Sequence, residues 1–172
     1  MEGDERRQFI LKLLAGSESP LSGTEIAGKC GVSRQIIVQD IALLRATNKN
    51  ILSTYRGYLL YQPEKDKENF KRTFAVSHTD EQIQDELYIF VDCGGRVLDV
   101  TVMHEIYGAI TVDLILNNRV DVDDFITRLS TTPAKPLKEL TGGNHMHTVE
   151  ASSPEVFDRI EEQLKKKGYL IR

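Results

Sequence analysis

The stretch "SGTEIAGKCGVSRQIIVQDIALL", residues 22–44, carries two helix-start signals separated by a turn. Ser22 is followed three residues later by Glu25, a capping-box pattern that predicts the start of a helix. Ser33 predicts the start of another helix, and the "CGVSRQ" segment is typical of a turn. The second helix has one apolar stripe: Ile37, Ile41 and Leu44. Together these signals predict a helix-turn-helix.

The residues on both sides extend this motif. Upstream, apolar residues at helical spacing predict an amphipathic helix, which "GSESP" ends: Phe9, Ile10, Leu13 and Leu14. Downstream, "ILSTYRGYLLY" predicts a hairpin with its turn at Arg56-Gly57. Three helices followed by a hairpin predict a winged helix-turn-helix over residues 1–62.

The outward face of the second motif helix has side chains that recognise DNA bases. Arginine pairs with guanine and glutamine with adenine in the major groove. The candidates for base contacts are Arg34, Gln35 and Gln39, and those for phosphate or minor-groove contacts are Thr24, Ser33 and Arg56. Residues 1–62 hold eight basic and six acidic residues, whereas the remainder holds 14 basic and 20 acidic ones. The alternative is a module of the same shape that contacts proteins.

Residues 63–70, with Pro63 and mixed charges, predict a linker to a second domain over residues 71–172. In this domain, strand patterns alternate with helix patterns. Strands are predicted at 70–78, 96–105, 109–116 and 145–151, and helices at 80–95, 120–130 and 153–168. The last helix has Ser153 as its predicted cap. This order predicts an α+β domain with helices on one face of a mostly antiparallel sheet.

The overall composition is that of a globular protein. The 172 residues are 40% hydrophobic and 28% charged, and no apolar run is long enough to predict a membrane span. The N-terminal sequence lacks a signal peptide pattern, so a cytoplasmic location is expected. The two cysteines lack CxxC spacing, which argues against a zinc-cysteine site.

All four histidines lie in the second domain. His145 and His147 alternate along a predicted strand, so their side chains project from the same side. His78 and Glu86 are plausible sources of a third and a fourth ligand. Imidazoles with one carboxylate suit zinc, nickel, copper or iron. The alternative for any single histidine is a hydrogen-bonded residue without a ligand.

Two segments carry a resemblance to known families. Residues 21–60, "LSGTEIAGKCGVSRQIIVQDIALLRATNKNILSTYRGYLL", are similar to the winged helix-turn-helix of biotin-ligase-type repressors. The stretches "VMHEIYGAITVDL" and "PLKELTGGNHMHTVEA", with the helix that holds Glu86, resemble the three-histidine domain of niacin-responsive transcriptional repressors. That second resemblance implies an open-faced α/β sandwich similar to the phosphocarrier HPr.

The resemblance also implies a site and a function. The implied metal ligands are His78, Glu86, His145 and His147, with Ni or Zn as the ion. His104 and Tyr107 would line an adjoining pocket for nicotinic acid, although Glu105 stands where the family motif commonly has proline. The implied protein is a homodimeric repressor that binds a double-stranded DNA operator. Its targets would be genes of NAD biosynthesis or niacin uptake, with nicotinic acid as co-repressor.

Two other functions are compatible with these residues. One is a transcriptional regulator that senses the metal itself. The other is a metal-dependent hydrolase with Glu86 or Glu105 as the base. The sequence has no HExxH, GxSxG or phosphate-binding glycine loop, so we expect no enzymatic activity.

Overall fold

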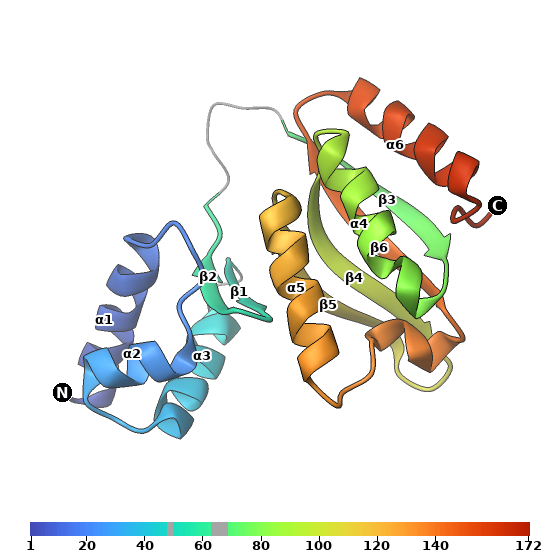
Figure 1. The fold of residues 1–172 in the computed structure, drawn as a ribbon. Helices are drawn as coiled ribbons and strands as arrows, with labels where there is room; N and C mark the ends of the chain where they lie inside the picture. Colours follow the sequence, from blue (N-terminus) through green and yellow to red (C-terminus); the bar gives the residue numbers. More distant parts are fainter. Residues whose placement is uncertain (48–49, 63–68) are drawn as a thin grey trace. The chain divides into compact units, whose positions relative to one another are not determined.

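The computed structural model describes residues 1–47, 50–62 and 69–172 (Figure 1). It divides the chain into two compact units, Met1–Lys65 and Asp66–Arg172. Most of the predicted linker, at 63–68, lies outside the described residues, and Phe70 is already the first residue of strand β3.

The N-terminal unit has the three helices and the hairpin predicted for a winged helix-turn-helix. Its elements are α1 (Gly3–Ala15), α2 (Gly23–Cys30), α3 (Arg34–Thr47), β1 (Ile51–Thr54) and β2 (Gly57–Leu60). Both predicted caps are present: Ser22 Oγ accepts from the Glu25 N–H at 3.1 Å, and Ser33 Oγ accepts from the Ile36 N–H at 3.4 Å. The apolar stripes of the three helices meet in one core that includes Ile10, Ile26 and Ile37.

The hairpin is fixed to the helices through the segment before α2. Leu21 and Tyr58 exchange two backbone hydrogen bonds, of 2.9 and 2.8 Å. Gly57 permits this approach, because a Cβ atom there would lie 2.3 Å from the Leu21 carbonyl oxygen. Its φ of 140° is also one that other residues rarely adopt.

The C-terminal unit is a four-stranded antiparallel sheet in the order β3-β6-β4-β5, with three helices on one side (Figure 1). The strands are β3 (Phe70–Ser77), β4 (Arg96–His104), β5 (Gly108–Leu116) and β6 (Asn144–Ala151). The helices are α4 (Ile83–Asp92), α5 (Arg119–Thr131) and α6 (Pro154–Lys167), with short 3-10 helices η1 (Asp80–Gln82) and η2 (Leu137–Thr141). The predicted α+β fold is therefore confirmed.

The core of this unit lies between the sheet and the helices. Val97, Val102 and Val149 from the sheet are fully buried there, as are Phe90 and Ile160 from the helices. The predicted position of Ser153 at the start of α6 is confirmed. Ser153 occupies the N-cap position, but its side chain makes no capping hydrogen bond. Among the described residues, every helix falls short of the length and apolar content needed to cross a membrane.

Candidate metal site and DNA-binding surface

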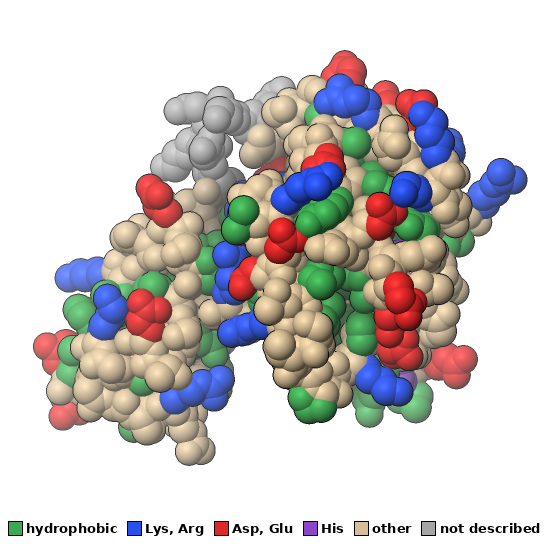
Figure 2. All heavy atoms as spheres, viewed as in Figure 1, with side chains coloured by type: hydrophobic (Ala, Val, Ile, Leu, Met, Phe, Trp, Pro, Cys, Tyr) green, Lys and Arg blue, Asp and Glu red, His purple; other side chains and the backbone are tan. Residues whose placement is uncertain are grey.

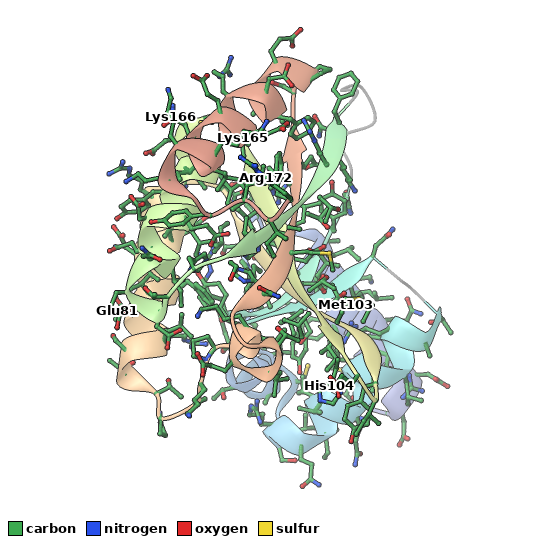
Figure 3. The ribbon with its side chains drawn as sticks, turned by 90° about the vertical axis from the view of Figure 1, so that its right-hand side faces the viewer. Glu81, Met103, His104, Lys165, Lys166 and Arg172 are labelled. Carbon is green, nitrogen blue, oxygen red and sulfur yellow. The ribbon has the colours of Figure 1, made fainter. Side chains whose placement is uncertain are left out.

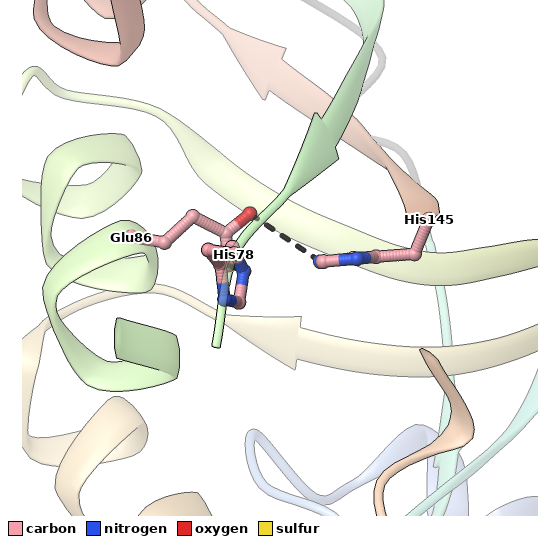
Figure 4. Close-up of side chains that lie close together, drawn as sticks. All are labelled: His78, Glu86 and His145. Carbon is pink, nitrogen blue, oxygen red and sulfur yellow. Dashed lines mark ion pairs between the residues drawn. The ribbon is translucent and has the colours of Figure 1, made fainter. Parts of the chain in front are cut away.

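The four predicted metal ligands come together between the sheet and α4. His145 and His147 project from β6 toward the helices, and antiparallel pairing sets Val76 of β3 opposite His145. His78, just beyond the end of β3, is thereby brought next to β6. Glu86 of α4 meets the histidines from the helical layer (Figure 4).

Glu86 is the centre of this cluster. Its Oε2 atom lies 3.1 Å from His78 Nε2, and its Oε1 atom lies 3.7 Å from His145 Nε2 and 3.3 Å from His147 Nε2. Two ligands bound at about 2.1 Å to a tetrahedral ion are roughly 3.4 Å apart. Ligand atoms of His78, Glu86 and His145 all lie within 4.8 Å of one another, which suits a transition-metal ion. His147 contacts Glu86 but lies outside that group of three.

Each imidazole is oriented by a backbone carbonyl. Nδ1 of His78, His145 and His147 contacts the carbonyl oxygens of Thr79, Gly143 and Asp99 at 2.8, 2.8 and 2.7 Å. A carbonyl oxygen can only accept, so each Nδ1 must carry the proton. The Nε2 atoms of the neutral rings are then free to bind a metal, as in most histidine metal sites.

Several buried atoms of the cluster lack hydrogen-bond partners among the described residues. Both carboxylate oxygens of Glu86 and Nε2 of His78 make no hydrogen bond, although their side chains are at most 1% exposed. Burial alone would raise the pKa of Glu86, but the positive charge of the nearby His147 and the closeness of the His145 and His78 imidazoles lower it well below its ordinary value. Burial lowers the pKa of His147, but Glu86 more than offsets this and raises it overall. Unpaired acceptors that face one another require a cation or protons.

The three histidine side chains of the cluster are buried. In Figure 2, acidic and basic side chains are interspersed over the C-terminal unit, and very little histidine surface is visible on the face shown. The side chains of His78, His145 and His147 are at most 5% exposed. Such enclosure strengthens electrostatic interactions within the cluster.

A pocket of about 730 Å³ lies at the same end of the sheet as the cluster. Its wall includes Met146, which alternates with His145 and His147 along β6 and therefore projects from the opposite face of the sheet. His145 belongs both to the cluster and to the pocket wall. The other polar wall residues include His104, Thr141 and Asn144, and the apolar ones include Met103, Ile106, Leu140, Met146 and Ile171. Figure 3 shows Met103 and His104 where β4 approaches the turn to β5, well away from Lys165 and Lys166 of α6.

The structure places the two predicted effector contacts differently. His104 lines the pocket, whereas Tyr107 does not. Tyr107 lies in the turn beyond β4, is 76% exposed, and stacks on the His104 ring at a centroid distance of 4.9 Å. It turns outward because the Ile106 and Tyr107 N–H groups both donate to His104 Nδ1, which holds the turn against that ring.

In the N-terminal unit, the predicted DNA contacts form an exposed surface. Thr24, Ser33, Arg34, Gln35 and Gln39 are all exposed, and Arg56 in the hairpin turn is half-buried. The opposite face of α3 is held in the core by its apolar stripe. The first turns of α3 are therefore available to a DNA groove.

One residue that positions α3 is absent from the sequence prediction. Asp40 is 3% exposed, and it accepts from Arg6 Nε at 2.6 Å and from Arg7 Nη1 at 3.1 Å. The signal was present, because Asp40 interrupts the apolar stripe between Ile37 and Ile41. A charge on the buried face of a helix calls for a partner.

The comparisons with known proteins agree with this architecture. A family model described as HTH domain matches residues 6–59, and one described as 3H domain matches residues 71–172. A probable transcription repressor NiaR from Thermotoga maritima is 42% identical over 167 residues, covering 97% of this chain and 94% of the relative. The transcription repressor NadR of Bacillus subtilis is 38% identical over 171 residues, covering 99% and 95%.

Proposed function

Because the chain belongs to the family of helix-turn-helix transcription repressors that carry a 3H domain, we propose that nicotinic acid controls its binding to DNA. The acid would act as co-repressor and bind beside the cluster of three histidines and Glu86. The repressor would act in the cytoplasm on genes of NAD biosynthesis or niacin uptake.

The observation that carries this proposal is the position of His145, whose side chain belongs to the cluster on one face of the sheet and which also borders the pocket on the other face. Nicotinate is a flat anion, and residues 63–172 have six more acidic than basic residues, which would repel it. A Ni²⁺ or Zn²⁺ ion held by His78, Glu86, His145 and His147 would supply the compensating positive charge.

The chain's own residues would select the ring and its carboxylate. The side chains of Met103, Leu140 and Met146 offer apolar contact to a flat ring. His104 Nδ1 already accepts two backbone N–H groups. A neutral His104 ring therefore has its proton on Nε2, from which it can donate to a carboxylate.

The proposed repressor is a homodimer on a two-fold symmetric operator. Helix-turn-helix dimers bind half-sites separated by about one helical turn of DNA, roughly 34 Å, or a multiple of it. A co-repressor favours the DNA-binding arrangement only through its higher affinity for that arrangement. Nicotinate bound in the C-terminal unit would thus have to bind more tightly when the recognition helices are correctly spaced.

Thermal unfolding with nicotinate, nicotinamide or NAD, each before and after chelation of metal, tests this proposal. We expect nicotinate to raise Tm only in the metal-loaded protein, because a ligand that binds the folded state stabilises it. The double variant His145→Ala, His147→Ala should lose both metal and the response to nicotinate. Full metal content and full nicotinate affinity in that variant would contradict the proposal.

A repressor that senses the metal itself is the second candidate. The near-complete burial of all four ligand side chains favours it, because little of the ion would be accessible to an effector. In that case Ni²⁺ or Zn²⁺ alone would increase the affinity for the operator, and nicotinate would add nothing.

A further inference from the structure

Lys138, in the 3-10 helix η2, is an unusual lysine because it is only 5% exposed. Its ammonium lies 2.5 Å from Oδ1 of Asp80 and 3.8 Å from Oε1 of Glu139. Burial of an ammonium is unfavourable unless it is paired. The two carboxylates explain why the buried ammonium is stable. They do not explain why a lysine, and not an apolar residue, stands at this position.

The ammonium of Lys138 also holds the segment that carries one predicted ligand. Nζ donates to the backbone carbonyl of His78 at 3.3 Å. Asp80, its charged partner, lies two residues further along the same segment. One side chain therefore fixes the loop from the end of β3 to η1 at two points, on either side of Thr79.

The backbone carbonyl of Lys138 holds the segment that carries a second ligand. It accepts hydrogen bonds from the N–H of Gly143 at 3.0 Å and from Oγ1 of Thr141 at 3.2 Å. The carbonyl of Gly143 in turn accepts from Nδ1 of His145 at 2.8 Å. Lys138 is thus connected to the His145 ring through a single intervening residue.

We propose that the ammonium of Lys138 is a positioning group for the metal site, because it fixes η2, whose backbone orients His145, against the segment that presents His78. The inference rests on the proposed metal site. Leu140 and Thr141 of the same 3-10 helix line the pocket, so Lys138 also ties the pocket wall to the two ligands. Loss of partners that orient metal ligands typically weakens metal binding about 10- to 100-fold.

The test is Zn²⁺ affinity of the full chain, measured by competition with a chromophoric chelator. In Lys138→Met, which keeps the length and apolar stem but removes the ammonium, we expect an affinity about 10- to 100-fold weaker. Asp80→Asn, which leaves the lysine with a weaker partner, should lie between this variant and the wild type. Lys135→Met changes an exposed lysine three residues away and should match the wild type.

Tm of the metal-free variants separates positioning from general destabilisation. The proposal expects Lys138→Met to bind Zn²⁺ weakly while its metal-free Tm stays close to that of the wild type. Wild-type Zn²⁺ affinity in Lys138→Met overturns it, as does a loss of affinity matched by an equal loss of metal-free stability. If Lys138→Met does not fold, the proposal is tested by Asp80→Asn alone, and wild-type Zn²⁺ affinity in that variant overturns the proposal. A wild-type chain that does not bind Zn²⁺ or Ni²⁺ overturns the metal site as well.

Discussion

Nε2 of His147 lies 3.3 Å from Oε1 of Glu86, and each side chain is at most 5% exposed. This contact joins β6 to α4 in the interior of the C-terminal unit. The His147 ring also has an apolar neighbour, because the Phe90 ring packs against it at a centroid distance of 5.5 Å. A polar cluster enclosed in this way stabilises the fold only when its charges are balanced.

Removal of metal is therefore expected to destabilise the C-terminal unit. At a free ion concentration about one hundred times Kd, binding stabilises the folded state by about 2.7 kcal/mol. A chelator should lower Tm of the wild type accordingly. In Glu86→Gln the shift should be absent, because the amide cannot replace the carboxylate at the centre of the cluster. Differential scanning fluorimetry with and without chelator measures both.

Glu81→Gln is the matched control for that comparison. Glu81 precedes α4 by two residues but is exposed and outside the cluster (Figure 3). It should keep the full response to the chelator. A chelator shift of wild-type size in Glu86→Gln would mean that the ion binds elsewhere.

The different positions of His104 and Tyr107 predict different effects on nicotinate binding. His104→Ala removes the proposed Nε2–H donor to the carboxylate, and a hydrogen bond to a charged group contributes about 1.5 kcal/mol or more, roughly tenfold in Kd. Tyr107→Ala removes an exposed ring outside the pocket and should change Kd little. Isothermal titration calorimetry on metal-loaded protein distinguishes them, and a larger effect of Tyr107→Ala would place the effector outside the pocket.

Local signals in the sequence predicted most of the fold. The caps at Ser22 and Ser33 and the alternation of His145 with His147 depend on residues only two or three positions apart, so short sequence windows contain them. Ser153 shows the limit of such signals, because it stands at the N-cap position but makes no capping bond.

The parts of the site that the sequence does not predict depend on contacts between segments far apart in the chain. Lys138 and Asp80 are 58 positions apart, and no local pattern marks this lysine as buried. The Asp99 carbonyl reaches His147 where the pairing of β4 with β6 is irregular, between Val97 and Thr101. Sequence periodicity does not reveal such a bulge. The pairing of His78 with Glu86 was predicted through the family resemblance, since spacing made them only plausible ligands.

Asp40 is expected to stabilise the N-terminal unit and to position α3. Asp40→Asn weakens its interactions with Arg6 and Arg7, and loss of a hydrogen-bonded buried carboxylate costs about 1.5 to 3 kcal/mol. The free energy of unfolding, measured in urea by circular dichroism, should fall by this amount. Asp4→Asn removes a carboxylate that is 97% exposed and also contacts Arg7, and it should have little effect. Equal losses in the two variants would show that Asp40 has no special role.

Two glycines should respond to alanine in opposite directions. Gly57→Ala forces a Cβ atom against the Leu21 carbonyl at a φ of 140°, and we expect a destabilisation of roughly 2 kcal/mol or more. Gly28→Ala in α2 meets no atom within 4 Å and should stabilise by about 0.5 to 1 kcal/mol. Urea unfolding checks both signs. A neutral Gly57→Ala would mean that the hairpin is not held against Leu21 in solution.

Arg34, at the start of α3, is predicted to contact a base. If it pairs with a guanine, Arg34→Ala should weaken operator binding by about 1 to 3 kcal/mol and leave binding to random DNA nearly unchanged. Arg45, exposed in the last turn of the same helix, provides the control. Because the N-terminal residues of a recognition helix contact base edges, Arg45→Ala should not change the preference for the operator. Fluorescence anisotropy at several salt concentrations separates the two effects. An equal loss on operator and random DNA, with a salt dependence reduced by about one phosphate contact, would instead assign Arg34 to the DNA backbone.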